Sequence, residues 1–413
     1  MGIGNIWRFP YIVGTNGGGA FLVTYLIVVF SFGLAFMILE LAVGRYHKTS
    51  VVSALQRIRK RFRLIGFVMV GVTLAIVSYY MVVLGWIISY FAITILDLNL
   101  SFDQFTGSMY PVVAFLAIVG LNYFVIRSGI KNGVEKLSKY GVLLLIAIII
   151  PLTVIGLTLP GAEPGIEFYL TPDYSKAFLP EVWSVAIGQA FFSLSVGMGV
   201  LVTYGSYLQE ERRSVLKSSL IIIVADILIA FMAGLMIFSM VFASEMDPAH
   251  GTSLVFRVMP AIFSNIEYGM FAAALFFLLL FLAGITSSIS MFQMPVSALE
   301  DAFKLDRNRA TLVITIAALA AGIPSALSYS SVDLKIFETA VFDLVDRWFG
   351  TYGIALAAAL FTVAVTWFMD RKQLMEQINA HSPVRFPGWT LSVVRFALPA
   401  LIIATVLSQI LQL

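Results

Sequence analysis

Long apolar stretches recur along almost the whole chain and restrict what it can fold into. Ten of them are long enough to cross the roughly 30 Å hydrocarbon core of a bilayer as a helix, which takes about 18 residues or more. They cover residues 20–43, 65–96, 109–126, 138–159, 181–207, 216–243, 268–298, 310–328, 334–369 and 387–411. Only helices and closed barrels satisfy their own backbone polar groups in lipid, and no alternating strand pattern of the barrel type is present. The sequence therefore predicts an all-α, polytopic membrane protein.

The composition excludes several classes of function. Of the 413 residues, 60% are hydrophobic and 12% are charged, and a water-soluble domain could not bury that much apolar surface. The formal net charge of +3 is too small and too dispersed for a nucleic-acid partner. The chain has no Cys, and His47, His250 and His381 lack metal-ligand spacing, which argues against a transition-metal site. Because no Ser-His-Asp, HExxH or paired catalytic Asp motif is present, the sequence does not predict an enzyme.

Positive charge is concentrated in alternate loops. Five segments between the apolar stretches hold 20 of the 26 Lys and Arg residues: 45–63, 127–139, 210–217, 300–309 and 370–385. Short cytoplasmic loops of membrane proteins retain such charge. We therefore expect these segments to be cytoplasmic and the C-terminus to be extracellular, in a multi-pass protein of the cell inner (plasma) membrane.

Two glycine-dense stretches interrupt the apolar pattern. The first is Gly2-Ile3-Gly4-Asn5, and the second is residues 193–199, in the middle of the stretch 181–207. A helix that is broken within lipid leaves N–H and C=O groups that need an ion or a substrate. For either stretch alone, helix packing through small residues is the simpler explanation. Their spacing, five spans apart, favours an internal repeat of five helices whose paired breaks form a binding site at the bilayer midplane.

Several blocks of the sequence resemble the neurotransmitter:sodium symporter family, in its bacterial amino-acid-transporter branch. They are GIGNIWRFPYIVGTNGGGAF at 2–21, ELAVGRY at 40–46, YY at 79–80, FFSLSVGMG at 191–199, AGITSSIS at 283–290 and EDAFKL at 300–305. The resemblance implies a five-plus-five inverted-repeat transporter fold with discontinuous first and sixth helices. It divides the chain into a first repeat with helices 1b to 5 (1–159), an extracellular loop (160–180), a second repeat with helices 6 to 10 (181–371) and a C-terminal helix 11 (372–413).

The start of the sequence departs from the family pattern. Members of the family begin with a basic tail and the inner half of the first helix, whereas this sequence opens at the first break, with Met1. The resemblance therefore predicts a further segment before Met1, absent here through a late start assignment or a truncation. If translation begins at Met1, we expect transport to be weak, leaky or lost.

By the same resemblance, the chain binds the carboxylate of an amino acid at the first break. The amides of Ile3 and Gly4 and the hydroxyl of Tyr80 would hold it, since free N–H groups at a helix start attract anions. Gly2 stands where monoamine transporters have Asp, which implies a substrate with its own carboxylate. Two adaptable methionines in the side-chain pocket suit a bulky apolar or aromatic side chain. The predicted walls are Ile76, Tyr80, Phe192, Ser195, Met198, Ser287, Ser290 and Met291.

The resemblance also implies sodium as the coupling ion. Asn5, Ser193 and Asp226 would supply side-chain oxygens to one ion, and hard oxygen ligands without Cys or His suit an alkali cation. In chloride-dependent members an Asn and a Ser occupy the places of Asp226 and Ala230, so the fixed carboxylate here could replace the anion. A structural hydrogen bond is the alternative role for Asp226. The predicted metal ligands are Met1, Asn5, Ser193, Asp226, Ala283, Thr286 and Ser287. For Thr286 and Ser287 the alternative is a hydroxyl that hydrogen-bonds to the backbone of its own helix.

Charged residues near both ends of the pocket match the family's gates. Arg8 lies inside a span, where an unpaired guanidinium is costly, and Asp346 is its expected partner, with Asp343 as a second candidate. Snorkelling of Arg8 to the external interface is the alternative. The other predicted gate residues are Asp301, Tyr207 and Gln293 on the inner side and Glu40, a buried acid expected to brace the break of the first helix.

The function predicted from these features is sodium-coupled symport of a hydrophobic or aromatic L-amino acid by alternating access, without a covalent step. A proton-coupled amino-acid transporter is the nearest alternative, and an amino-acid-gated channel or sensor is another. The expected partners are the amino-acid substrate, Na⁺ and the lipid bilayer.

Overall fold

Helices make up nearly all of the computed structural model, which describes residues 2–411 apart from 99, 209–213, 249–253 and 383–384. Eight helical segments among these residues are long and apolar enough to cross a membrane. They are Gly19–His47, Lys60–Ile95, Tyr110–Arg127, Gly133–Thr158, Val215–Ala243, Gly269–Phe303, Arg307–Ser328 and Val341–Phe368. Of the other two predicted spans, 181–207 is divided into two short helices, and 387–411 forms α20 (Gly388–Leu411). The architecture is the all-α one that the sequence predicts.

In the first part of the chain, short π-helical or 3-10 segments (η) interrupt and extend the α-helices. The elements in chain order are η1 (Gly4–Arg8), α1 (Phe9–Thr15), α2 (Gly19–Val28), η2 (Val29–Gly33), α3 (Leu34–His47), α4 (Val51–Ile58), η3 (Lys60–Phe62), α5 (Arg63–Ile95), α6 (Phe102–Thr106), α7 (Tyr110–Arg127), η4 (Ile130–Glu135) and α8 (Lys136–Thr158). Met1, a predicted metal ligand, lies outside the described residues.

In the second part, two small helices fill the predicted outer loop 160–180 before the spans resume. The elements are α9 (Glu163–Leu170), α10 (Tyr174–Ala177), α11 (Pro180–Ser193), α12 (Val200–Ser206), α13 (Val215–Ala243), η6 (Leu254–Val258), α14 (Met259–Phe263), α15 (Gly269–Phe303), α16 (Arg307–Ser328), β1 (Lys335–Ile336), β2 (Thr339–Ala340), α17 (Val341–Val345), η7 (Asp346–Gly353), α18 (Ile354–Phe368), α19 (Arg371–Asn379) and α20.

The predicted span 334–369 begins later than expected. Strands β1 and β2 pair antiparallel as a short hairpin, and the helix starts only at Val341. The hairpin turn has positive φ at Phe337 (48°) and Glu338 (62°). The segment carries two charged residues, Lys335 and Glu338, so it lies more favourably in water than in lipid. The prediction was wrong for residues 334–340.

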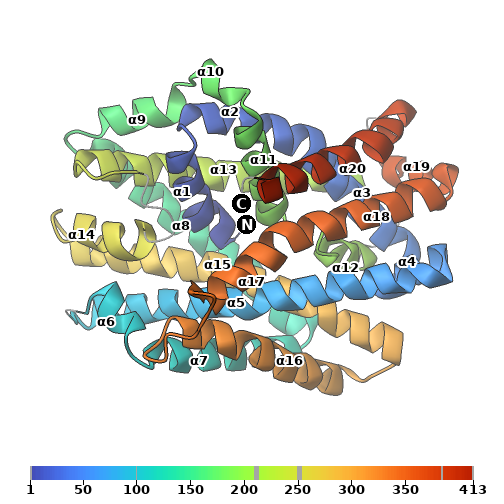
Figure 1. Ribbon diagram of the computed structural model, residues 1–413, viewed down its shortest axis with the longest axis horizontal. Coiled ribbons are helices and arrows are strands. Elements are labelled where there is room, and N and C mark those ends of the chain that lie inside the picture. The colour runs from blue at the N-terminus through green and yellow to red at the C-terminus, as the bar shows by residue number, and fades with distance from the viewer. Residues whose placement is uncertain (1, 99, 209–213, 249–253, 383–384, 412–413) are drawn as a thin grey trace.

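Helix α5 runs along the long axis of the molecule and lies between two groups of helices (Figure 1). It packs against α7 and α16 on one side and against α15 and α18 on the other. Helices α3 and α12 pack together, α13 packs against α8, and α20 packs against α18. Helices α7 and α8 leave large apolar side chains such as Val113, Phe124 and Leu143 exposed. Such faces need a lipid surrounding, because monomeric soluble proteins rarely expose continuous apolar bands.

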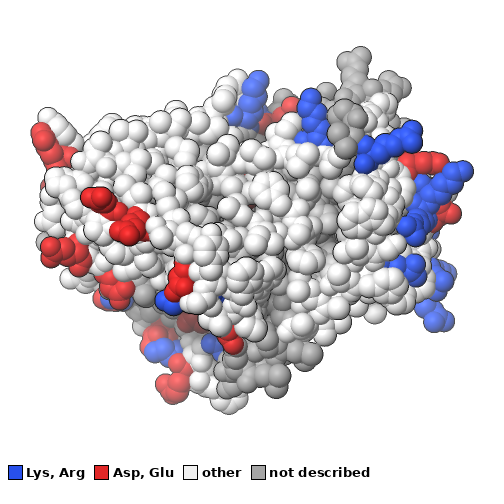
Figure 2. Space-filling view, turned by 90° about the horizontal axis from the view of Figure 1, so that it is seen from above, with Lys and Arg blue, Asp and Glu red and all other residues white. Residues whose placement is uncertain are grey.

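Charge separates along the long axis. Figure 2 shows Lys and Arg gathered at one end of the molecule and Asp and Glu at the other. The basic end carries α4 and α19, and the acidic end carries α6, α9 and α14 (Figure 1). Two of the predicted cytoplasmic segments, 45–63 and 370–385, therefore lie at the same end, as a common membrane side requires.

Candidate functional site

The sixth helix of the predicted fold is interrupted between α11 and α12. Residues 194–199 lie outside both helices, and φ is positive at Ser195 (52°), Gly197 (83°) and Gly199 (74°). At Gly197 a Cβ atom would also approach the Cβ of Ala358 to 2.9 Å, so both the backbone angle and the close passage of α18 require glycine. The predicted break is present, and it exposes backbone groups in the interior of the molecule.

The first glycine-dense stretch has a different form from the one expected. The chain is already helical at Ile3, and Gly4–Arg8 forms the π-helix η1, which runs directly into α1. Within the described residues it is a widened helical turn rather than an extended break, and π-turns of this kind are common at functional sites. At Gly4 a Cβ atom would lie 3.1 Å from the Phe192 ring and 3.5 Å from the Cα of Ser193. The two glycine-dense stretches therefore lie side by side, and Gly4 permits the close approach.

Glu40 braces the second break, and among the described residues no hydrogen bond joins it to the first stretch. Its carboxylate accepts a hydrogen bond of 3.2 Å from the amide of Gly199, which corrects the expectation from the sequence. From the opposite side, the hydroxyl of Thr73 on α5 donates to the carbonyl of Met198 at 2.9 Å. Both side chains are fully buried, so they satisfy backbone groups that the interrupted helix leaves without partners.

Three of the predicted sodium ligands form a compact cluster of oxygen atoms. The Ser193 hydroxyl lies 2.8 Å from Oδ1 of Asn5 and 2.8 Å from Oδ2 of Asp226. The Asn5 amide nitrogen also donates to the backbone carbonyl of Asp226 at 2.8 Å. All three residues are buried, and they come from η1, α11 and α13. The cluster gathers three side-chain oxygens, one of them from a carboxylate, in the interior, so it suits a small cation or a proton.

The second group of predicted ligands is held within one helix. The Thr286 hydroxyl lies 3.0 Å from the carbonyl of Ala283 and 3.1 Å from that of Leu282 on α15. This is the back-bonding that Thr adopts in membrane helices without any ion. Ser287 lies beside the first stretch, since its hydroxyl borders the space next to Gly2. Thr286 and Ala283 thus lie in contact, but a hydrogen bond within the helix explains this contact without a cation.

The predicted substrate residues converge on the start of the chain. The Ile3 amide donates to the Tyr80 hydroxyl at 3.2 Å, so one N–H group of the expected carboxylate site faces the tyrosine. The Tyr80 hydroxyl would lie 3.3 Å from a Cβ atom at Gly2, which therefore has no room for a side chain. The predicted wall residues come from α5, α11 with the following break, and α15; Ile76, Tyr80, Phe192, Met198 and Met291 are buried, and Ser195, Ser287 and Ser290 are partly buried.

The guanidinium of Arg8 contacts Gln189, a residue that was not predicted from the sequence. Its guanidinium donates to Oε1 of Gln189 at 3.2 Å, and the other end of that amide donates to the carbonyl of Gly4 at 2.9 Å. The guanidinium also lies 4.6 Å from the centre of the Phe192 ring. Gln189 could have been found from the sequence, since it is polar, lies inside a predicted span and precedes Ser193 by one helical turn.

The two outer acids have partners of their own. Asp346 accepts a hydrogen bond of 2.6 Å from Tyr79, and Asp343 accepts from Tyr329 at 3.1 Å. Among the described residues no ion pair joins Arg8 to either acid, so the direct contact expected between Arg8 and Asp346 is not formed. The amide of Gln189 and the ring of Phe192 take the place of a carboxylate beside the buried guanidinium.

Predicted inner-gate residues link α12 to α15. The Gln293 amide donates to the Tyr207 hydroxyl at 3.2 Å, and Tyr207 bonds Ser297 at 2.9 Å. Asp301 accepts from the Thr49 hydroxyl and from the Ser50 amide, both at 2.5 Å. These contacts tie α15 to Tyr207, directly after α12, and to the residues directly before α4.

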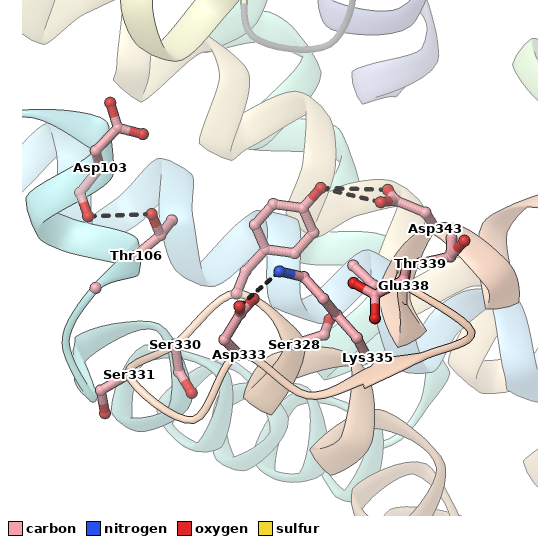
Figure 3. Close-up of a pocket in the computed structure, with 13 residues that line it drawn as sticks. Asp103, Thr106, Ser328, Ser330, Ser331, Asp333, Lys335, Glu338, Thr339 and Asp343 are labelled. Carbon is pink, nitrogen blue, oxygen red and sulfur yellow. Dashed lines mark hydrogen bonds and ion pairs between the residues drawn. The ribbon is translucent and has the colours of Figure 1, made fainter.

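A separate open cavity of about 640 Å³ lies near the acidic end (Figure 3). It is bordered by α6 and by residues 328–343, and among the described residues none of those predicted to bind substrate or sodium lines it. In it the Lys335 amine donates to Asp333 at 2.6 Å, and this carboxylate raises the pKa of Lys335 above its ordinary value. The cavity is therefore distinct from the candidate site.

Comparisons with known proteins agree on one family. The sequence model of the sodium:neurotransmitter symporter family matches residues 1–108 and 88–413. The chain is 33% identical to an uncharacterized sodium-dependent transporter of Methanocaldococcus jannaschii, over 94% of this chain and 82% of that protein. It is 31% identical to an uncharacterized sodium-dependent transporter of Haemophilus influenzae, over 99% and 94% of the two chains.

A solved structure shares the fold. The crystal structure of MhsT in complex with L-phenylalanine superposes with a TM-score of 0.90, at 31% sequence identity, over 99% of this chain and 95% of that one. The predicted resemblance and the predicted all-α membrane fold are confirmed by these matches.

Proposed function

This chain belongs to the sodium:neurotransmitter symporter family, and we propose that it carries a hydrophobic or aromatic L-amino acid together with sodium by alternating access. It is a member of a transporter family and not an enzyme. Two of its relatives are named as sodium-dependent transporters, and the matching solved structure holds L-phenylalanine. These names support the proposal for the ion and for the substrate class.

The observation that carries the proposal is the oxygen cluster of Asn5, Ser193 and Asp226. It brings an amide oxygen, a hydroxyl oxygen and a carboxylate together in a buried position, and hard oxygen ligands of this kind suit an alkali cation. A sodium ion at this place would take all three oxygens as ligands and balance the charge of the buried carboxylate. A proton on the carboxylate would neutralise the same charge, which keeps the proton-coupled alternative testable.

The surroundings of Gly2 support a substrate that brings its own carboxylate. The Tyr80 hydroxyl and Ser287 occupy the space where a side chain at position 2 would extend, so this position offers no fixed anion to a substrate amine. The Ile3 amide can exchange its contact with Tyr80 for a substrate carboxylate. Met198 and Met291 are buried nearby and adaptable, which favours leucine-like to tryptophan-like side chains.

The contacts at the basic end support a conformation that is closed on that side. The hydroxyls of Tyr204 and Ser290 form a hydrogen bond of 2.9 Å. Three residues after Tyr204, the hydroxyl of Tyr207 forms a hydrogen bond with Ser297. In alternating access these bonds between α12 and α15 have to break before substrate leaves. We propose that the basic end faces the cytoplasm, that residues 1–159 and 181–371 form the two repeats, and that Arg8 and Asp346 take part in the outer gate.

Labelled amino-acid uptake into proteoliposomes tests the proposal. Uptake should require an inwardly directed sodium gradient and should be inhibited by unlabelled phenylalanine, leucine or tryptophan, but not by glycine, proline or a charged amino acid. Uptake driven by a pH gradient without sodium would favour the proton-coupled alternative. Ion currents that bear no fixed ratio to substrate uptake would favour an amino-acid-gated channel.

A further inference from the structure

An open groove on the outer face of α19 carries an excess of positive charge. Helix α19, Ala380 and Arg385 border a cavity of about 670 Å³, a size typical of sites for small molecules. Its lining includes Arg371, Lys372, Met375, Glu376, Asn379 and Arg385. Three of these side chains are cationic and one is anionic, so the groove as a whole attracts an anion.

Helix α19 is fixed to the rest of the protein by the opposite face. Leu374 and Ile378 are buried, one helical turn apart. On the same side, Gln373 accepts a hydrogen bond of 2.9 Å from Tyr46, and Gln377 accepts from the buried Arg45 of α3. Lys372, Met375, Glu376 and Asn379 recur at intervals of three and four residues, which places them together on the face turned away from α3.

The far wall of the groove is also held in place. The Phe386 amide donates to Oδ1 of Asn379 at 2.6 Å. One guanidinium nitrogen of Arg371 donates to the carbonyl of Gly388 at 2.7 Å. These bonds join the two ends of α19 to Phe386 and to Gly388, the first residue of α20.

The cations of the groove are available to a ligand. Lys372 and Arg385 are exposed, and no ion pair within the described part of the chain joins either of them to an acidic side chain. Arg371 uses only part of its guanidinium on the backbone, which leaves further N–H donors. An anion with several acceptor oxygens, such as a phosphate group, matches this donor set.

The groove lies at the boundary between lipid and water. Helix α18 ends at Phe368 and α20 begins at Gly388, so α19 lies between the ends of two spans. In sequence Trp367 and Trp389 stand on either side of α19, with 45% and 66% of their surface exposed, and exposed tryptophans at span ends lie at the level of the headgroups. An anion that enters the groove would most readily be part of the membrane itself.

We propose that this groove binds the headgroup of an anionic phospholipid, with the phosphate against Lys372 and Arg385. Basic pockets between the ends of membrane helices recognise anionic headgroups in this way. Free phosphate offers the same chemistry, but the two exposed tryptophans favour the lipid. The site is independent of the proposed transport site, and none of the residues assigned to substrate or sodium takes part in it.

Native mass spectrometry of the full chain, titrated with phosphatidylglycerol or phosphatidylcholine, tests the proposal. Phosphatidylglycerol should be retained in preference to phosphatidylcholine. The double variant K372Q/R385Q should weaken phosphatidylglycerol binding by about 25-fold, because each basic residue near the headgroup contributes about fivefold. The matched control is K60Q/R61Q, which removes the same charge from exposed residues of η3 outside the groove and should leave binding at the wild-type level.

A variant that is expected to strengthen lipid binding keeps the test independent of any loss of folding. Glu376→Gln removes the one carboxylate that lines the groove and should strengthen phosphatidylglycerol binding by about fivefold. The proposal is overturned if K372Q/R385Q and K60Q/R61Q bind alike, or if Glu376→Gln weakens binding. Full displacement of the lipid by equimolar inorganic phosphate would assign the groove to free phosphate and overturn the lipid as its occupant.

Discussion

The substitution Ser193→Ala tests the proposed sodium site most directly. It removes the oxygen that lies 2.8 Å from both Asn5 and Asp226, together with the only hydroxyl hydrogen that these contacts share. The change is small and the position is buried, so the surrounding packing should be kept. If the cluster holds sodium, one ligand is lost while the other two stay in place.

The size of the effect of Ser193→Ala follows from the charge of the sodium ion that the hydroxyl would bind. An interaction with a charged group in a buried place contributes about 1.5–3 kcal/mol, more than a neutral hydrogen bond does. At about 1.4 kcal/mol for each factor of ten, the half-saturating sodium concentration for uptake should rise roughly 10- to 100-fold. The maximal rate at saturating sodium should change much less, because the residue touches the ion and not the substrate.

The assay is initial uptake of labelled phenylalanine or leucine into proteoliposomes at varied external sodium and fixed membrane potential. Ser219→Ala is the matched control. Ser219 is also a fully buried serine, on α13 two turns before Asp226, and its hydroxyl has no hydrogen-bond partner within the described part of the chain. Its loss should leave the sodium dependence unchanged, and the thermal stability of both variants in detergent reports whether folding is intact.

Two results would refute this reasoning. The first is a folded Ser193→Ala protein with the sodium dependence of the wild type, which would mean that the cluster is a structural hydrogen-bond network. The second is an equal loss in Ser193→Ala and Ser219→Ala, which would mean that the effect comes from packing at buried serines in general.

Three further substitutions address the neighbouring elements. Gly2→Val places a side chain against Ser287 and should abolish amino-acid binding in a radioligand assay, and the melting temperature of the same variant reports the cost of overpacking. Glu40→Ala leaves a backbone amide of the second break without its acceptor, and the unfolding free energy should fall by about 1–3 kcal/mol. Gly197→Ala forces a side chain into a left-handed conformation and should lower the melting temperature, whereas Gly188→Ala, with open space around it on α11, should not.

The spans and the second break could be predicted from the sequence because each has a strong local cause. An apolar run of sufficient length has few alternatives to a membrane helix. Gly197 and Gly199 in a serine-containing stretch remove the preference for helix, and the structure has positive φ at both. The hairpin at 335–340 was missed because its apolar residues continue the hydropathy of the span that follows, and only the charges between them indicate a loop.

The form of the first stretch and the partners of Arg8 could not be predicted in the same way. A π-turn at Gly4–Arg8 depends on how the chain meets α11 and α13, and composition does not encode that contact. The partner of Arg8 was expected to be an acid because a buried guanidinium needs compensation. A neutral amide, Gln189, supplies it together with the Phe192 ring, and a sequence motif gives no reason to prefer that pair over a carboxylate.

The positions of the two ligand sets suggest how ion and substrate would be coupled. Asn5 belongs to the oxygen cluster, and Ile3, two residues earlier on the same turn, contacts Tyr80 of α5. A cation among Asn5, Ser193 and Asp226 would fix η1 against α11 and α13, and would thereby fix the direction of the Ile3 amide. A carboxylate at that amide would in turn stabilise the same turn. By linkage each ligand has to raise the affinity for the other by the same factor, so coupling requires no direct contact between ion and amino acid.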